Sequence, residues 1–119
     1  MEVARGPRSV RVRLARVAEG VMALNSAARP SAGRGRWITL DGKEVIVGVV
    51  VAGDTAGKVE MQLHLDLVGE LVPIEPLAAK IRADVEDRAR REGLAGHLGQ
   101  VDITIHDLIL QPAEKGDGR

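Results

Sequence analysis

The sequence predicts a single small α+β domain in which two helices pack on one mixed sheet. A chain of 119 residues suffices for one domain and is short for two. Two segments show the helical spacing of apolar residues, and four others alternate or mix apolar and polar residues as strands do. The predicted order along the chain is α-β-β-β-α-β.

The first helix is predicted to begin after Ser9, which can act as its N-cap, and to end near Asn25. Its apolar residues recur at steps of four and three, which places them in one stripe on one face. They are Val10, Leu14, Val17, Val21 and Leu24. We expect residues 1–8 to form a flexible basic tail, because Gly6-Pro7 opposes an earlier helix.

A loop is predicted at 26–35 and a hairpin at 36–52, with Asp41-Gly42 supplying the positive φ of the tight turn. The arm from Glu44 to Ala52 is apolar on both faces. Such a strand is central in a sheet, covered on both sides, or in contact with another subunit. We therefore expect self-association through Val45, Val47, Val49 and Val51.

The next strand is KVEMQLHLDLV (58–68), in which every second residue is apolar, so one face is dry and the other polar. The second helix is predicted from Ile74 to about Glu92, with Ile74, Leu77, Ala78, Ile81, Val85 and Ala89 on its inner face. QVDITIHDLIL forms the last strand, which completes a domain at 9–110. Residues 111–119 are predicted to be a disordered tail.

His64 and His106 fall on the polar faces of their strands, and Asp66 lies close to His64. If the two strands are neighbours, these side chains can converge as weak candidates for a metal site. The alternative is an ordinary solvated strand face, which we favour because the ligand spacing matches no metal motif. No cysteine is present, and the serines lack the setting of a nucleophile elbow, so we expect no catalytic residues and no cofactor.

The apolar residues include Trp37 but neither Phe nor Tyr. Aromatic side chains bury the most area per residue, so this core is thin for its length. Association with a second copy would bury further apolar surface, which favours a homo-oligomer. No stretch approaches the roughly 20 apolar residues of a membrane span, and the N-terminus lacks the apolar run of a signal peptide, so we expect a cytoplasmic protein.

Charge is unevenly distributed along the chain. Residues 1–36 hold eight Arg against two Glu, a net of +6, which the remaining residues balance with nine basic against fifteen acidic side chains. The basic part can meet nucleic acid or anionic lipid, or it can dock on the acidic part of the protein, and we favour docking. A nucleic-acid surface would use Arg11, Arg13, Arg16, Arg34 and Arg36.

The order of these segments resembles the alkaline shock protein family of Gram-positive bacteria, also called general stress proteins. The resemblance is carried by KVEMQLHLDLV, GELVP, IEPLAAKIRADVEDRARR and QVDITIHDLIL, and by VRLARVAEGVMAL near the N-terminus. The chain departs from the family in having Val68-Gly69 where Tyr-Gly is common, and in the position of Pro76.

The resemblance implies a non-enzymatic cytoplasmic protein of cell-envelope stress homeostasis. It further implies a self-associating scaffold that a separate anchoring partner recruits to the membrane, with no direct membrane span. No catalytic residues carry over from the family to this sequence. The alternative function is a nucleic-acid-binding module that uses the basic first helix and the arginine-containing loop.

Overall fold

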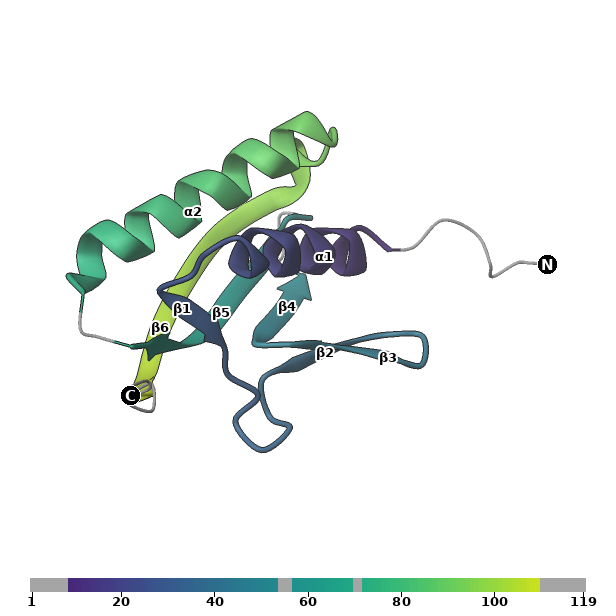
Figure 1. Cartoon of the computed structure of the whole chain (residues 1–119). Helices are drawn as coiled ribbons and strands as arrows, with labels where there is room; N and C mark the ends of the chain where they lie inside the picture. The colour runs from purple at the N-terminus through teal and green to yellow at the C-terminus, as the bar shows by residue number, and fades with distance from the viewer. Residues whose placement is uncertain (1–8, 54–56, 70–71, 110–119) are drawn as a thin grey trace, which may run out of the picture.

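The computed structural model describes residues 9–53, 57–69 and 72–109 (Figure 1). The two predicted tails, 1–8 and 111–119, lie outside the described residues. The elements are α1 (Val10–Ala23), β1 (Ala28–Pro30), β2 (Ile38–Asp41), β3 (Glu44–Val47), β4 (Val49–Gly53), β5 (Val59–Val68), α2 (Ile74–Arg91), the 3-10 turn η1 (Ala95–His97) and β6 (Leu98–Ile109). The predicted α+β class and the order α-β-β-β-α-β are confirmed, with the predicted arm at 44–52 divided into β3 and β4.

Strand β5 is the centre of a mixed sheet. Strand β6 runs parallel along one edge of β5, while β4 and β1 pair antiparallel with its other edge. Because β4 pairs with residues 59–63 and β1 with residues 65–67, these two strands follow one another along that edge. His64 therefore lies where the pairing passes from β4 to β1.

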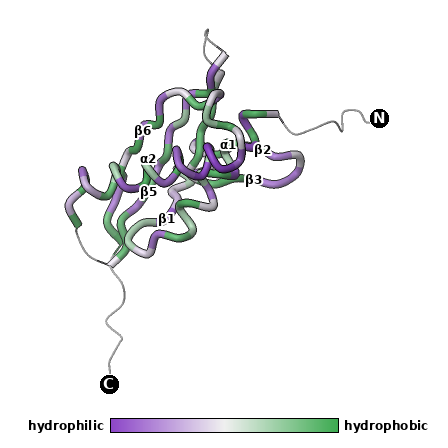
Figure 2. The backbone as a smooth tube through the Cα atoms, turned by 90° about the horizontal axis from the view of Figure 1, so that it is seen from above, coloured by the Kyte–Doolittle hydropathy of each residue, from purple (hydrophilic) through white to green (hydrophobic). Residues whose placement is uncertain are grey.

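Both helices cover the same face of this sheet (Figure 1). The side chains of β5 that face them are buried: Val59, Met61, Leu63, Leu65 and Leu67. Hydrophobic and hydrophilic residues alternate along the helices and β6 in Figure 2, as an element with one buried face requires. The prediction of a dry and a polar face for β5 is confirmed on the dry side.

Helix α1 begins where its cap predicts, since the Ser9 hydroxyl accepts a hydrogen bond from the backbone N–H of Val12 at 3.2 Å. Its stripe is partly buried at Val10 and buried from Leu14 to Val21, but Leu24 lies beyond the last turn and is exposed. In α2, Leu77, Ile81, Val85 and Ala89 are buried, whereas Ile74 is half exposed. The apolar periodicity thus predicts the helices correctly and fails at one terminal residue of each.

The prediction of one continuous strand over 44–52 is wrong. Gly48 has φ +82° and separates β3, which pairs with β2, from β4, which pairs with β5. A Cβ at this position would lie 2.7 Å from Pro30 Cβ and 2.9 Å from the His64 carbonyl oxygen. Only glycine allows the chain to bend here so close to β1 and β5. Pro30 itself belongs to β1, a short strand inside the predicted loop at 26–35.

Candidate functional site

The polar face of the sheet carries a stack of three rings built on Trp37, His64 and His106. The two imidazoles are joined by a hydrogen bond of 2.8 Å between His64 Nδ1 and His106 Nε2, and their planes differ by 18°. The indole of Trp37 is parallel to both, at centroid distances of 4.5 Å from His64 and 3.8 Å from His106. We call His64 and His106 the imidazole pair.

A β-bulge in β6 contains His106. In the parallel ladder of β5 and β6, Leu65 pairs with Ile105 and Asp66 pairs with Asp107, so His106 is an extra residue between two pairs. Bulges re-aim a side chain and are rare between parallel strands. His64 itself pairs with Thr104, and without the bulge His106 would be the residue that pairs with Asp66.

The backbone around His64 joins three segments of the chain. His64 N–H donates to the Gly48 carbonyl at 2.8 Å, and the His64 carbonyl accepts from Ser31 N–H at 2.8 Å. Gly48 N–H in turn donates to the Trp37 carbonyl at 2.7 Å, which closes the base of the β2–β3 hairpin. The ring stack and the base of the hairpin are therefore parts of one structure.

The turn that carries Trp37 has an unusual backbone. Gly33, Arg34 and Gly35 have φ values of +57°, +59° and +87°, and Trp37 N–H donates to the Ala32 carbonyl at 3.0 Å. A Cβ on Gly33 would lie 2.3 Å from the indole, so glycine is needed for the ring to reach its place. Arg34 holds a left-handed conformation that costs about 1 kcal/mol for a non-glycine residue, which the surrounding contacts must offset.

Hydrogen bonding fixes the protonation pattern of the imidazole pair. His64 Nε2 lies 3.2 Å from the Gln62 side-chain oxygen, which can only accept, so Nε2 carries a proton. In neutral His64 the other nitrogen, Nδ1, then accepts, and His106 Nε2 is its donor. Burial, followed by the charge of His106, lowers the pKa of His64 below its ordinary value of 6.5.

The expectation of an ordinary solvated strand face is wrong for His64, which is 7% exposed, and correct for Gln62 and His106. The two histidines of the weak metal candidate do meet, but Asp66 does not complete a set with them. In the part of the chain that the structure describes, no three His, Cys, Asp or Glu side chains gather as a metal would require. One nitrogen of each imidazole is hydrogen-bonded to the other ring instead.

A second feature is an apolar surface on the β2–β3 hairpin. Strand register pairs Ile38 with Val47 and Leu40 with Val45, and these four side chains lie on the same side of the hairpin. We call them the outward face. Leu40 is 61% exposed and Val45 is 47% exposed, while Ile46 on the opposite side is fully buried in the core.

A groove of about 330 Å³ adjoins the outward face. It runs between the start of α1, strand β2 and strand β4. Its lining residues are Ser9, Arg11, Val12, Ile38, Thr39, Leu40, Val50 and Val51. Of the four valines predicted for self-association, Val45 and Val47 are on the outward face and Val51 is at the groove, but Val49 is fully buried and belongs to the core.

Arg16 attaches the hairpin to α1. Its guanidinium donates to Asp41 at 2.9 Å and to Glu19 at 2.8 Å, and it also pairs with Glu44 across the hairpin turn. The hydrogen bonds to Glu19 and Asp41 raise the pKa of Arg16 above its usual value. Arg16 is thus docked on carboxylates of this chain, whereas Arg11, Arg13, Arg34 and Arg36 are exposed. The Arg36 guanidinium lies 5.6 Å from the Trp37 ring centroid.

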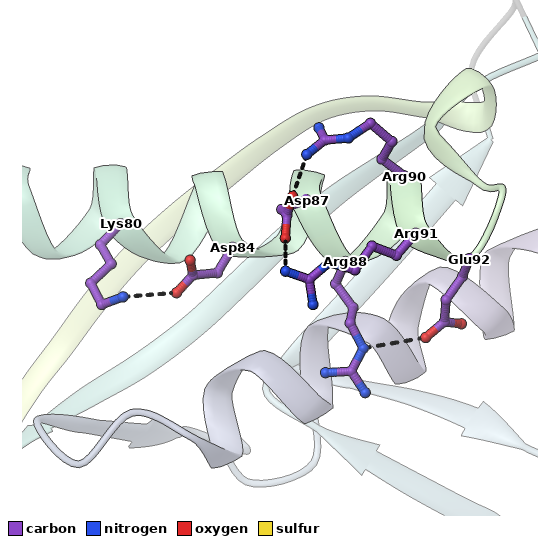
Figure 3. Close-up of polar contacts among 7 residues, drawn as sticks. All are labelled: Lys80, Asp84, Asp87, Arg88, Arg90, Arg91 and Glu92. Carbon is purple, nitrogen blue, oxygen red and sulfur yellow. Dashed lines mark hydrogen bonds and ion pairs between the residues drawn. The ribbon is translucent and has the colours of Figure 1, made fainter.

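Charged side chains along α2 pair with one another (Figure 3). Lys80 pairs with Asp84 at 3.1 Å, Arg88 with Glu92 at 3.3 Å, and Asp87 with both Arg90 and Arg91. Several of these residues line a groove of about 280 Å³ against the end of α1. Exposed pairs of this kind contribute only tenths of a kcal/mol each, and they characterise a solvated helix face.

Sequence reasoning missed Trp37 as a partner of the histidines. One signal was present: Trp37 is the only aromatic residue of the chain outside the histidines, and it follows a glycine-rich segment. The bulge at His106 left no such signal, because strand register is a property of two strands together.

Comparison with protein families, curated proteins and solved structures gave no match to this chain. The resemblance to the alkaline shock protein family therefore stays a prediction from the residues. Among the residues that the structure describes, no helix is long and apolar enough to cross a membrane.

Proposed function

We propose that this chain is a non-enzymatic scaffold that self-associates through the outward face of its β2–β3 hairpin. The observation that carries the proposal is the exposure of paired aliphatic side chains, Leu40 and Val45, on a projecting hairpin. Exposed aliphatic patches on small domains mark contact surfaces, because leaving such area in water costs free energy.

The adjoining groove supports a second copy as the occupant. A two-fold contact places the same surface of both copies together, so it needs a surface that both projects and recedes. The outward face projects, and the groove beside it is walled by Val12, Val50 and Val51. Such a contact would add apolar burial to a core that has no Phe or Tyr.

For the cellular role we propose cell-envelope stress homeostasis in the cytoplasm, with recruitment to the membrane by an anchoring partner. This part of the proposal is supported by the resemblance described above. A non-catalytic role is likewise supported by that resemblance.

A nucleic-acid-binding module is the second candidate function. It is favoured by Arg34 and Arg36, which a strained turn holds exposed, and by Arg11 and Arg13 on the open side of α1. Phosphate contacts from these side chains would release counterions and make binding sensitive to salt.

Fractionation of the cells that produce the chain tests the two functions against each other. Membranes are washed at high salt and then treated with nuclease. Retention of the chain on membranes through both steps is expected for an anchored scaffold. Release of the chain by nuclease would instead establish nucleic-acid binding, if the double variant Arg34→Gln with Arg36→Gln no longer shows this release.

A further inference from the structure

The imidazole pair can bind protons, and the proposed scaffold role does not require this. We propose that double protonation of His64 and His106 separates the two rings, frees Trp37 and loosens the base of the β2–β3 hairpin, so that acid weakens self-association. The last step rests on the proposed function, whereas the separation of the rings does not.

The first proton leaves the pair intact. His106 Nε2 already donates to His64 Nδ1, so a proton from solvent binds Nδ1 of the exposed His106 ring. The bond between the rings then becomes charge-assisted, and the cation lies 3.8 Å from the indole centroid, where a cation–π contact is favourable. One proton therefore keeps the stack together.

The second proton breaks it. It must bind His64 Nδ1, because His64 Nε2 already carries the proton that Gln62 accepts. Two N–H groups and two positive charges would then face each other across 2.8 Å, and neither nitrogen could accept. Since burial lowers the pKa of His64, this step occurs below pH 6.5.

Side chains of both charge signs surround the imidazole pair, so some favour and some oppose its protonation. Glu60 and Asp66 lie on the same face of β5, and in β6 Asp102 is opposite Gln62 and Asp107 is opposite Asp66. Arg29 of β1 is opposite Asp66, and Arg36 lies over Trp37. Strand β4 contributes Val50 opposite Gln62 and no charge there. Histidine variants leave all these charges in place, so they isolate the pair itself.

Backbone hydrogen bonds couple the separation of the rings to the hairpin. Trp37 immediately precedes β2, and its carbonyl accepts the Gly48 N–H that ends the hairpin. Gly48 is in turn held by His64 N–H. A displacement of Trp37 therefore disturbs one of the contacts that fix the hairpin, others being those of Arg16, and changes the orientation of the outward face.

The test uses Trp37 as a reporter, because it is the only Trp in a chain without Tyr. Its fluorescence and the sedimentation coefficient of the full chain are followed from about pH 8 to about pH 5, the range in which histidines titrate. We expect quenching as the first proton binds, then a red shift of the emission together with a lower sedimentation coefficient. Far-UV circular dichroism verifies that the domain stays folded.

Variants distinguish the pair from other titrating groups. His106→Gln can donate to or accept from His64, so it should remove the red shift, whereas His97→Gln, in the exposed turn η1, should behave as the wild type. An unchanged Trp37 emission across this range, or a red shift that persists in His106→Gln, overturns the separation of the rings.

The sedimentation readout distinguishes the failure of each proposal. A red shift of the Trp37 emission with no change in the sedimentation coefficient of an assembled species overturns the claim that the imidazole pair controls self-association. The proposed function is unaffected by that result. A chain that is monomeric at about pH 8 overturns the proposed function, and the fluorescence then decides alone whether the rings separate.

Discussion

At the scale of single residues, glycines decide whether the ring stack can form. Gly48 and Gly33 both hold positive φ, and both approach another group too closely for a Cβ. Gly35 has a similar φ of +87° but faces open space. The three positions thus separate the cost of backbone strain from the cost of a steric clash.

Replacement of Gly48 by Ala should lower the free energy of unfolding by at least about 2 kcal/mol, because strain is added to a clash with Pro30 and the His64 carbonyl. Gly35→Ala, the matched control, should cost about 1 kcal/mol from strain alone. Urea unfolding followed by Trp37 fluorescence measures both. Equal losses in the two variants would show that the approach of Gly48 to β1 is not tight.

His64 makes stability depend on pH. Its pKa is lowered in the folded chain from 6.5, so the unfolded chain binds the proton first as pH falls. Stability is therefore complete above pH 6.5 and declines below it until the folded His64 is also protonated. Urea midpoints at a series of pH values should fall in this window for the wild type and fall less for His64→Gln.

At the scale of elements, the alternation of apolar residues predicts β5 and β6, and the helical stripe predicts both helices. The break at Gly48 was not predicted, because the close approach of Pro30, 18 positions earlier in the chain, which leaves no room for a Cβ there, is a tertiary contact. The site was predictable in part. The polar faces of β5 and β6 indicate that His64 and His106 can meet, while Trp37 reaches them only through the turn at 31–37.

The attachment of the hairpin to α1 depends on Arg16. Arg16→Gln removes the charge that faces Asp41, Glu19 and Glu44, so the hairpin should open more often from α1. Amide hydrogen exchange is expected to accelerate in β2 and β3 while β5 and β6 keep their rates. Arg13→Gln, an exposed neighbour on the same helix, should leave the exchange of all four strands unchanged.

At the scale of the whole molecule, the compact part is a sheet covered on one face by two helices, and the hairpin projects from it (Figure 1). The fold buries Val49 completely, so Val49→Lys would place an unpaired charge in the core. We expect that variant to unfold, at a cost above about 3 kcal/mol, and it cannot report on association. Substitutions at Leu40 and Val45 can report on association, because both side chains are already in contact with water.

Sedimentation velocity of the full chain at neutral pH, compared with Leu40→Lys and Val45→Lys, tests self-association most directly. We predict an assembled species for the wild type and a folded monomer for both variants, since lysine on the outward face opposes its contact with a second copy. Arg13→Gln should sediment as the wild type. A monomeric wild type, or variants that assemble as the wild type does, would contradict the assignment of the outward face as the contact surface.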